Sequence, residues 1–375
     1  MYKIKCKVHN LKESKIFRVS KQFRLKEMFS DLVIKVYDNN LPIIKYKHFI
    51  TTQHVEKSIT NNIFISDVHI DDIKSLNDKD IILVTPDGSI TKLWNINTND
   101  NLLFLTDYCN SKCVMCPQTE CSELKHYYEQ SQIILGLINK KPQDICLSGG
   151  EPTFLKNEYL KIVKQINKQF PNVFLYVLTN GKNFSNFDFV KQCVLNSPLR
   201  TTYAIPIYSP NVKKHDYIVG AQGSFKNTIY GLYNLYKFKQ NIEIRIVITK
   251  INYTELLELS HFIYWNLPFV NHIAFIGMET HGNAMKNFNE VWIEPQEYMD
   301  NLSKAIEYLD ERSMNVSIFN LPFCILPAKL YKFARDSISS WKKYYLPECE
   351  NCKMKETCSG FFSTSCNVPK GIKSI

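Results

Sequence analysis

Three cysteines lie within eight positions of one another, at residues 109, 113 and 116, in the segment CNSKCVMC. A structural zinc site closes its coordination with four ligands, so this loop is one ligand short of zinc. An iron–sulfur cluster held by three cysteines instead keeps one iron open to a small-molecule ligand. Cys109, Cys113 and Cys116 are therefore candidate metal ligands, and an iron–sulfur cluster fits their number better than zinc does.

Polar or glycine residues follow several apolar runs of strand length. In SGGEP (148–152), Gly149 and Gly150 would let the backbone approach a ligand closely, and Glu151 offers a carboxylate to an ammonium group. Similar endings occur at 179–181 (TNG), 208–210 (YSP), 250–252 and 277–279 (GME). Because the carboxyl ends of parallel strands form the ligand face of an α/β fold, we expect these endings and the three cysteines to meet at one opening.

The elements that would position these residues alternate along the chain. Helical periodicity separates the apolar runs, for example over 158–170, 224–238 and 253–265. Strands joined by crossover helices pair in parallel, so the alternation predicts an α/β fold with a partial (βα)6 barrel. A further helix is expected over 294–313 and a further strand over 315–320. The six runs expected as barrel strands are 101–108, 144–149, 174–181, 201–208, 243–250 and 272–279.

The first 95 residues have a different pattern. Short strand-like runs at 30–38, 61–68 and 80–95, the last broken by a Pro-Asp-Gly turn, predict a small β-rich domain that contains a hairpin. Nothing in this segment indicates its role. We therefore expect three parts: a β-rich domain at 1–95, the barrel core at 96–290 and a C-terminal extension at 291–375.

The C-terminal extension holds a second group of cysteines. Cys349, Cys352 and Cys358 have the spacing C-x2-C-x5-C, with Cys366 further on and Cys324 upstream in NLPFCILP. Half of a zinc ribbon is one interpretation of this spacing. If the group holds a cluster, its fourth ligand is Cys324 or Cys366. Cys324 is favoured, because it lies between two prolines at the end of an expected strand rather than near a terminus that can fray.

The barrel pattern resembles the radical S-adenosylmethionine (SAM) superfamily over about residues 100 to 285. The family's CxxxCxxC loop binds a [4Fe–4S] cluster whose open iron is chelated by SAM, and Cys109, Cys113 and Cys116 match it. The resemblance implies that the reduced cluster cleaves SAM and that a 5′-deoxyadenosyl radical then abstracts hydrogen from a substrate. It further implies that SAM binds to the GGEP segment, Gly149, Gly150, Glu151 and Pro152. At three weaker positions, it implies contacts of Ser209 and Arg245 with the SAM ribose and carboxylate, and backbone of Gly277 beside the adenine.

Longer segments, among them LTDYCNSKCVMCPQ and NVSIFNLPFCILP, resemble the HxsC family, the radical SAM maturases of the His-Xaa-Ser peptide system. The tail also resembles the auxiliary-cluster tails of peptide-modifying radical SAM enzymes, although their full seven-cysteine pattern is absent. The resemblance implies one auxiliary [4Fe–4S] cluster, a ribosomally made precursor peptide as substrate, and a second radical SAM maturase as partner. The bond formed on the peptide does not follow from the sequence.

Composition limits the other possibilities. The 375 residues carry a net charge of +10, but the lysines are dispersed, so a solvated surface is expected and nucleic-acid binding is not. No signal peptide or membrane span is evident, so we expect a cytoplasmic protein with no membrane partner.

Two rival functions stay open. One is a tRNA-modifying radical SAM enzyme, which the basic charge favours slightly. The other is a non-catalytic zinc-binding interaction protein in which both cysteine groups are structural.

Overall fold

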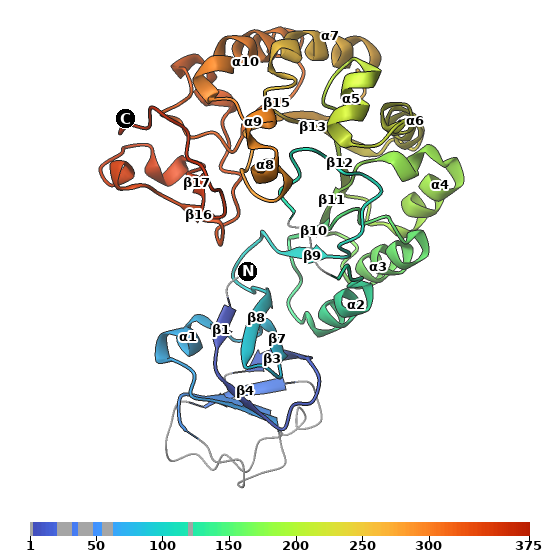
Figure 1. Cartoon of the computed structure of the whole chain (residues 1–375). Coiled ribbons are helices and arrows are strands. Elements are labelled where there is room, and N and C mark those ends of the chain that lie inside the picture. Colours follow the sequence, from blue (N-terminus) through green and yellow to red (C-terminus); the bar gives the residue numbers. More distant parts are fainter. Residues whose placement is uncertain (1–2, 21–31, 37–47, 55–62, 119–122) are drawn as a thin grey trace. The chain divides into compact units, whose positions relative to one another are not determined.

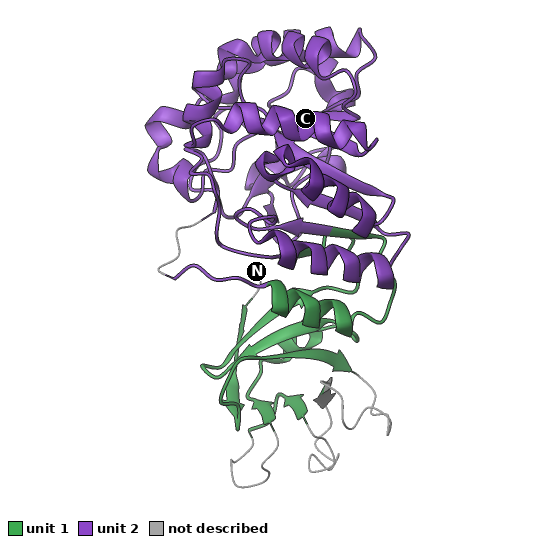
Figure 2. Cartoon of the chain, turned by 90° about the vertical axis from the view of Figure 1, so that its right-hand side faces the viewer, with its two compact units in different colours: residues 1–103, 128–145 green, residues 104–127, 146–375 purple. Residues whose placement is uncertain are grey.

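The computed structural model describes residues 3–20, 32–36, 48–54, 63–118 and 123–375 (Figure 1). The chain divides into two compact units (Figure 2). The first comprises residues 1–103 with 128–145, and the second comprises 104–127 with 146–375.

The first unit is built on an eight-stranded sheet with the order β1-β8-β7-β3-β4-β5-β6-β2. Strands β7 and β8 pair in antiparallel fashion, which confirms the expected hairpin, and Gly88 adopts a φ of 84° in its turn. Strands β3 to β6 pair in parallel. The strands are β1 (Lys3–Lys5), β2 (Lys7–His9), β3 (Lys15–Ser20), β4 (Leu32–Val36), β5 (His48–Thr51), β6 (Ile63–Ser66), β7 (Ile81–Thr85) and β8 (Ser89–Trp94).

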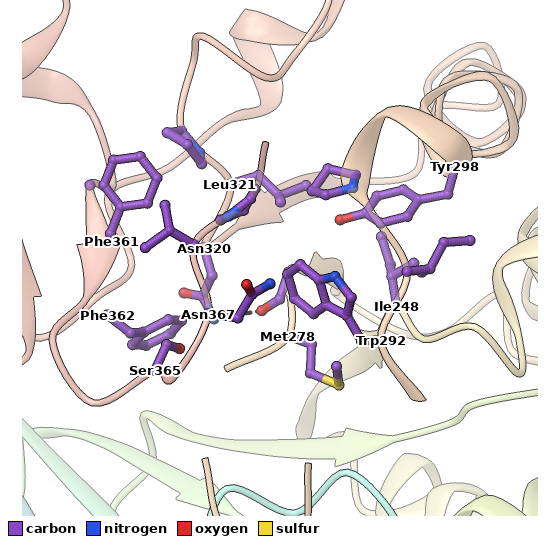
Figure 3. Close-up of a pocket in the computed structure, with 17 residues that line it drawn as sticks. Ile248, Met278, Trp292, Tyr298, Asn320, Leu321, Phe361, Phe362, Ser365 and Asn367 are labelled. Carbon is purple, nitrogen blue, oxygen red and sulfur yellow. Dashed lines mark hydrogen bonds between the residues drawn. The ribbon is translucent and has the colours of Figure 1, made fainter. Parts of the chain in front are cut away.

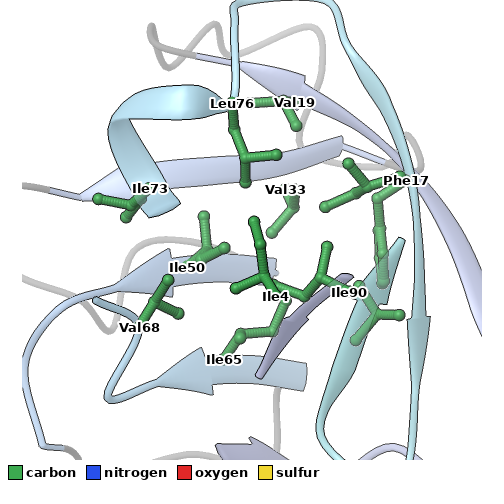
Figure 4. Packing of buried hydrophobic residues seen from close by; sticks show 12 residues of the cluster. Ile4, Phe17, Val19, Val33, Ile50, Ile65, Val68, Ile73, Leu76 and Ile90 are labelled. Carbon is green, nitrogen blue, oxygen red and sulfur yellow. The ribbon is translucent and has the colours of Figure 1, made fainter. Parts of the chain in front are cut away.

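The strands at the two edges of this sheet, β1 and β2, are consecutive in the sequence. Strand β1 pairs with β8 and strand β2 pairs with β6, and only Cys6 separates β1 from β2. The sheet therefore curls around its core until its two ends share a segment. Buried aliphatic and aromatic side chains, with two from around helix α1 (Ile70–Ser75), fill the interior (Figure 4): Ile4, Phe17, Val19, Val33, Ile50, Ile65, Val68, Ile73, Leu76, Ile82, Val84 and Ile90.

A seven-stranded sheet carries the expected barrel. Its strands follow one another in sequence order from β9 to β15, and the pairs from β11 to β15 are parallel. All six expected strands are present, and the further strand predicted over 315–320 adds the seventh. The strands are β9 (Leu102–Phe104), β10 (Asp144–Ser148), β11 (Phe174–Leu178), β12 (Thr201–Pro206), β13 (Asn241–Val247), β14 (His272–Ile276) and β15 (Val316–Phe319).

Helices connect these strands, and most of them lie around the outside of the curved sheet, whereas α8 lies on its inner side (Figure 1). The α/β fold with a partial barrel is confirmed. The helices are α2 (Tyr128–Leu137), α3 (Lys156–Gln169), α4 (Phe187–Asn196), α5 (Val212–Val219), α6 (Ser224–Lys237), α7 (Leu256–Asn266), α8 (Asn283–Lys286), α9 (Phe288–Val291) and α10 (Pro295–Asp310), with 3-10 turns η4 (Lys182–Ser185) and η5 (Tyr253–Glu255).

The two faces of the sheet differ in chemistry, as strand β13 shows. Ile242, Ile244 and Ile246 are fully buried on one face. Glu243 and Arg245 alternate with them and point to the other face, the barrel interior. Polar side chains from neighbouring strands join Glu243 and Arg245 there, so the interior of this partial barrel is hydrogen-bonded and charged rather than aliphatic.

The C-terminal extension has little regular structure. Beyond α10 and β15 it contains the turns η6 (Ala328–Phe333), η7 (Pro347–Cys349) and η8 (Lys355–Thr357) and a short antiparallel pair, β16 (Lys343–Tyr344) with β17 (Phe361–Phe362). None of the helices in the described ranges is long and apolar enough to cross a membrane.

Candidate functional site

The cysteine loop follows β9 and is held by hydrogen bonds from two sides. On one side, the backbone N–H groups of Lys112 and Val114 donate to Val219 and Ile218 at the end of α5, each at 3.0 Å. On the other side, the side-chain amide of Asn283 donates to the carbonyl of Cys113 at 3.1 Å, and that of Asn287 to the carbonyl of Val114 at 2.9 Å. The loop is thus fixed by its backbone, which leaves the thiols free for a ligand.

The three thiols lie close enough to influence one another. Burial, together with the neighbouring thiols of Cys116 and Cys109, raises the pKa of Cys113 to about 12. Cys109 is exposed and the other two are partly buried. Since a metal takes thiolates, binding a cluster here releases protons.

Gly149 and Gly150 pack against the segment that leads into the cysteine loop. The N–H of Gly150 donates to Thr106 O at 2.7 Å, and that of Glu151 donates to Tyr108 O at 2.8 Å. A Cβ on Gly150 would lie 2.4 Å from Tyr108 O, and one on Gly149, whose φ is +152°, would lie 2.6 Å from Thr106 O. The two glycines therefore fix the start of the cysteine loop by close backbone approach.

Glu151 accepts hydrogen bonds from neighbouring residues of the chain, and its contact with an ammonium group stays a prediction. Its side chain is fully buried, and both carboxylate oxygens are occupied. Oε1 accepts hydrogen bonds from Thr153 N at 3.0 Å, Thr153 Oγ1 at 2.6 Å and Thr179 Oγ1 at 2.8 Å, and Oε2 accepts one from Asn180 N at 2.8 Å. In this structure the carboxylate joins the ends of β10 and β11, with Pro152 buried directly after it.

Two residues after β11 belong to the site: Asn180, in the TNG ending that was expected at the opening, and Lys182, which the sequence patterns did not single out. The amide Nδ2 of Asn180 donates to Asn110 Oδ1 at 2.7 Å and lies 3.9 Å from Cys109 Sγ. Lys182 is almost buried and its ammonium donates to Asn110 O. Burial lowers the pKa of Lys182, and the nearby Cys109, Glu151 and Cys113 oppose this shift. For Lys182, its position directly after the TNG strand ending was the available signal.

Ser209 and Arg245 both form hydrogen bonds within the chain. Ser209 is fully buried, and its hydroxyl donates to Glu255 Oε2 at 2.8 Å. Arg245 donates from Nη1 to Glu243 Oε1 at 3.2 Å and to the Tyr176 hydroxyl at 3.4 Å inside the barrel. The contacts of Ser209 with the SAM ribose and of Arg245 with the SAM carboxylate stay predictions.

The interior network around Arg245 continues across two more strands. His272 contacts Glu243 Oε2 through Nδ1 at 2.8 Å and Ser317 Oγ through Nε2 at 2.9 Å. Burial raises the pKa of the Glu243 carboxyl, but the His272 hydrogen bond and the charge of Arg245 together bring it below its usual value. This network holds β13, β14 and β15 together from within.

Gly277, expected beside the adenine of SAM, follows β14. A Cβ there would lie 2.7 Å from the Leu321 side chain, so the glycine permits close packing against the chain after β15. Gly277 also lines a pocket together with residues of the C-terminal extension (Figure 3).

The second group of cysteines is brought together in part. Burial raises the pKa of Cys324, and the thiols of Cys358 and Cys349 add to this shift. Cys324 therefore lies near these two thiols. The backbone N–H of Cys352 donates to Cys349 O at 3.2 Å in the same turn. Cys366 is exposed, and its N–H donates to Thr280 O at the barrel rim at 3.0 Å.

The cysteine loop fits a [4Fe–4S] cluster. In the described part of the chain, no three or more His, Cys, Asp or Glu side chains are grouped so that they could hold one metal ion. A cubane cluster binds each cysteine at a different iron, so its ligands need not meet at one point. The three thiols carried on a braced loop, with the Lys182 ammonium nearby to offset thiolate charge, meet these requirements.

Comparison with known proteins agrees with this assignment. Residues 101–197 match the family model described as a 4Fe-4S single cluster domain. Among the described cysteines of that segment, Cys146 is in strand β10 and Cys193 is buried in helix α4, whereas Cys109, Cys113 and Cys116 share the loop. Cys109, Cys113 and Cys116 therefore stay the predicted ligands of the cluster of this domain. No curated protein matches the chain.

Several solved structures are similar in fold. They include SuiB of Streptococcus suis bound to S-adenosylmethionine (14% identity, 64% of this chain and 50% of that chain, TM-score 0.46). A second is a radical SAM methyltransferase from Sphaerobacter thermophilus (11% identity, 64% of this chain and 72% of that chain, TM-score 0.43). A third is coproporphyrinogen III oxidase from Escherichia coli, a radical SAM enzyme (13% identity, 56% of this chain and 51% of that chain, TM-score 0.43). The chain thus spans about half the length of SuiB.

Proposed function

We propose that this chain, a radical SAM enzyme by its fold and its [4Fe–4S] domain, modifies a ribosomally made peptide of the His-Xaa-Ser type. The observation that carries the enzymatic part is the braced loop of Cys109, Cys113 and Cys116 at the carboxyl end of β9. When bound, the cluster and S-adenosylmethionine supply a 5′-deoxyadenosyl radical that abstracts hydrogen from the substrate.

The chain's own residues position this chemistry. Two backbone hydrogen bonds, from Gly150 N to Thr106 O and from Glu151 N to Tyr108 O, set where the cysteine loop begins. The Asn180 amide and the Lys182 ammonium hold the loop at Asn110, next to the first cysteine. The Glu151 carboxylate belongs to this framework, and the backbone of the glycine segment is available to S-adenosylmethionine.

The C-terminal cysteines support the peptide part of the proposal. Cys324, Cys349, Cys352 and Cys358 would hold one auxiliary [4Fe–4S] cluster, and the proximity of Cys324 to Cys349 and Cys358 favours it over Cys366 as the fourth ligand. Iron content separates the two candidates. Cys324→Ala should lose about four irons while Cys366→Ala keeps them, and the reverse result would exchange their roles.

The experiment for peptide modification combines the reconstituted full chain, S-adenosylmethionine and a reductant with a synthetic precursor peptide that carries His-Xaa-Ser repeats. The assay is run with and without the second maturase that we propose as partner. A change in peptide mass together with 5′-deoxyadenosine supports the proposal. 5′-Deoxyadenosine with an unchanged peptide in both arms, and salt-sensitive copurification of RNA, would favour the tRNA-modifying alternative.

A further inference from the structure

A pocket that opens to solvent lies where the C-terminal extension covers the rim of the barrel (Figure 3). Ile248 and Gly277, which follow β13 and β14, form one wall. The opposite wall is formed by residues of the extension: Phe361, Phe362, Ser365, Asn367, Val368 and Pro369. The pocket thus exists only because the extension is docked on the barrel.

The extension is fixed there by a specific set of bonds. The Lys342 ammonium bridges both carboxylate oxygens of Glu279 at 3.1 Å, and the Thr364 hydroxyl donates to the same carboxylate. Next to them, Asn367 N donates to the Thr280 hydroxyl at 3.1 Å. These contacts hold the backbone of Asn367 at the rim, so its side chain has a defined position in the pocket.

The pocket is separate from the cysteine-loop site. By the two-residue period of the strands, Ile248 continues the buried face of Ile242, Ile244 and Ile246. Val247 alternates with Ile248 and packs with the hydrophobic cluster that contains Cys113 and Val114. Met278 lines the pocket and also packs in that cluster, so one side chain separates the two sites.

The lining selects for an uncharged ligand. No charged side chain lines the pocket within the described residues, and most of its wall is apolar or aromatic, including Trp292, Tyr298 and the two phenylalanines. Asn367 Nδ2 is buried and has no hydrogen-bond partner. A buried amide group left without a partner costs about 1–3 kcal/mol, so a ligand that bonds to it gains affinity.

We infer that this pocket binds one uncharged apolar or aromatic side chain of the substrate, with a neighbouring amide group hydrogen-bonded to Asn367. The choice of a peptide as ligand rests on the proposed function. A peptide supplies both parts at once, because an apolar side chain is always flanked by backbone amides.

The test uses the full reconstituted chain labelled with 5-fluorotryptophan and N-acetyl-L-phenylalaninamide as a neutral probe. The chain has four tryptophans, and Trp292→Phe assigns the fluorine resonance of the pocket. We expect a saturable shift of the Trp292 resonance, while that of exposed Trp265 stays unchanged. N-acetyl-L-lysinamide and the carboxylate N-acetyl-L-phenylalanine, which carry charge, should bind more weakly.

Asn367→Leu keeps the size of the side chain and removes the amide, so the probe should bind about three- to tenfold more weakly. Asn227→Leu, at an exposed position on α6, is the matched control and should not change binding. The inference would be overturned if the probe left the Trp292 resonance unshifted, or if it bound to Asn367→Leu as tightly as to the wild type. A Trp292 shift with adenosine but not with the amide probe would also overturn it. Formation of 5′-deoxyadenosine is measured on the same sample. If it persists when binding fails, only the pocket assignment is wrong.

Discussion

The backbone N–H of Asn180 donates to Glu151 Oε2 at 2.8 Å, while the side-chain amide of Asn180 lies 3.9 Å from Cys109 Sγ. A buried carboxylate is therefore connected to the cysteine loop through a single residue. Loss of the carboxylate should disturb the loop.

Glu151→Gln tests this connection. The glutamine amide cannot accept from every donor that the carboxylate satisfies, so at least one buried N–H loses its partner. We expect the free energy of unfolding in urea to fall by about 1–3 kcal/mol, and the reconstituted chain to retain less iron. Glu158→Gln on α3, whose carboxylate pairs with Lys161 at the surface, should change stability by less than about 1 kcal/mol. Equal effects of the two variants would contradict this role for Glu151.

Gly150→Ala tests the close approach of the backbone. Its Cβ would lie 2.4 Å from Tyr108 O, so the segment before the cysteine loop must move. We expect a destabilised chain that binds little iron at the loop. Gly136→Ala in α2 is the control, because nothing lies within 4 Å of the added carbon. That change should stabilise the protein by about 0.5–1 kcal/mol. Normal iron content in Gly150→Ala would show that the approach is not required.

The Lys182 ammonium should raise the midpoint potential of the loop cluster. Its ammonium lies near the loop thiols and stabilises the more negative, reduced state. Lys182→Met should lower the midpoint potential of the loop cluster by on the order of tens of millivolts, measured by potentiometric titration with electron paramagnetic resonance. Lys182→Arg should retain most of the potential, and Lys164→Met, at an exposed site, should leave it unchanged. A potential that is the same in Lys182→Met and wild type would exclude this role.

His215 should make stability depend on pH. Burial lowers its pKa to about 4 from 6.5; the charge of Asp216 opposes this shift and that of Lys182 adds to it. Nδ1 accepts the Tyr208 N–H at 3.3 Å, so the folded state holds a neutral ring. Between these pKa values the unfolded chain binds more protons, so stability is present above pH 6.5 and falls as pH falls towards 4, by about 3 kcal/mol in all.

The His215→Asn variant supplies the comparison, because the asparagine oxygen can accept the Tyr208 N–H but does not titrate. Urea unfolding at several pH values should show a loss of stability in the wild type that the variant lacks. Parallel pH profiles for the two proteins would contradict a buried neutral histidine.

Most of the barrel could be predicted because its signals are local. Each apolar run began at or near the start of a strand, and the run at 144–149 became β10 (Asp144–Ser148). Several runs were expected to extend further than the strand does, as at 272–279, where β14 ends at Ile276. The residues beyond the strand end, Gly277, Met278 and Glu279, lie at the barrel rim, where Gly277 is buried and the other two are partly buried.

The orientation of the site residues could not be predicted in the same way. Glu151 is in the expected segment, but its partners, Thr153 and Thr179, come from two different strand ends. Arg245 faces the barrel interior because of the pairing of β13, and Glu243 and Tyr176 compete there for its guanidinium. Such choices depend on tertiary neighbours, which the spacing of residues does not encode.

The most direct test of the account is iron and sulfide quantitation after anaerobic reconstitution, on the wild type and on the Cys109→Ala/Cys113→Ala/Cys116→Ala variant, together with electron paramagnetic resonance with and without S-adenosylmethionine. The account predicts about eight irons in the wild type and about four in the variant, with a spectrum that responds to S-adenosylmethionine only in the wild type. Zinc without iron in both proteins, or a spectrum that responds equally in both, would contradict it.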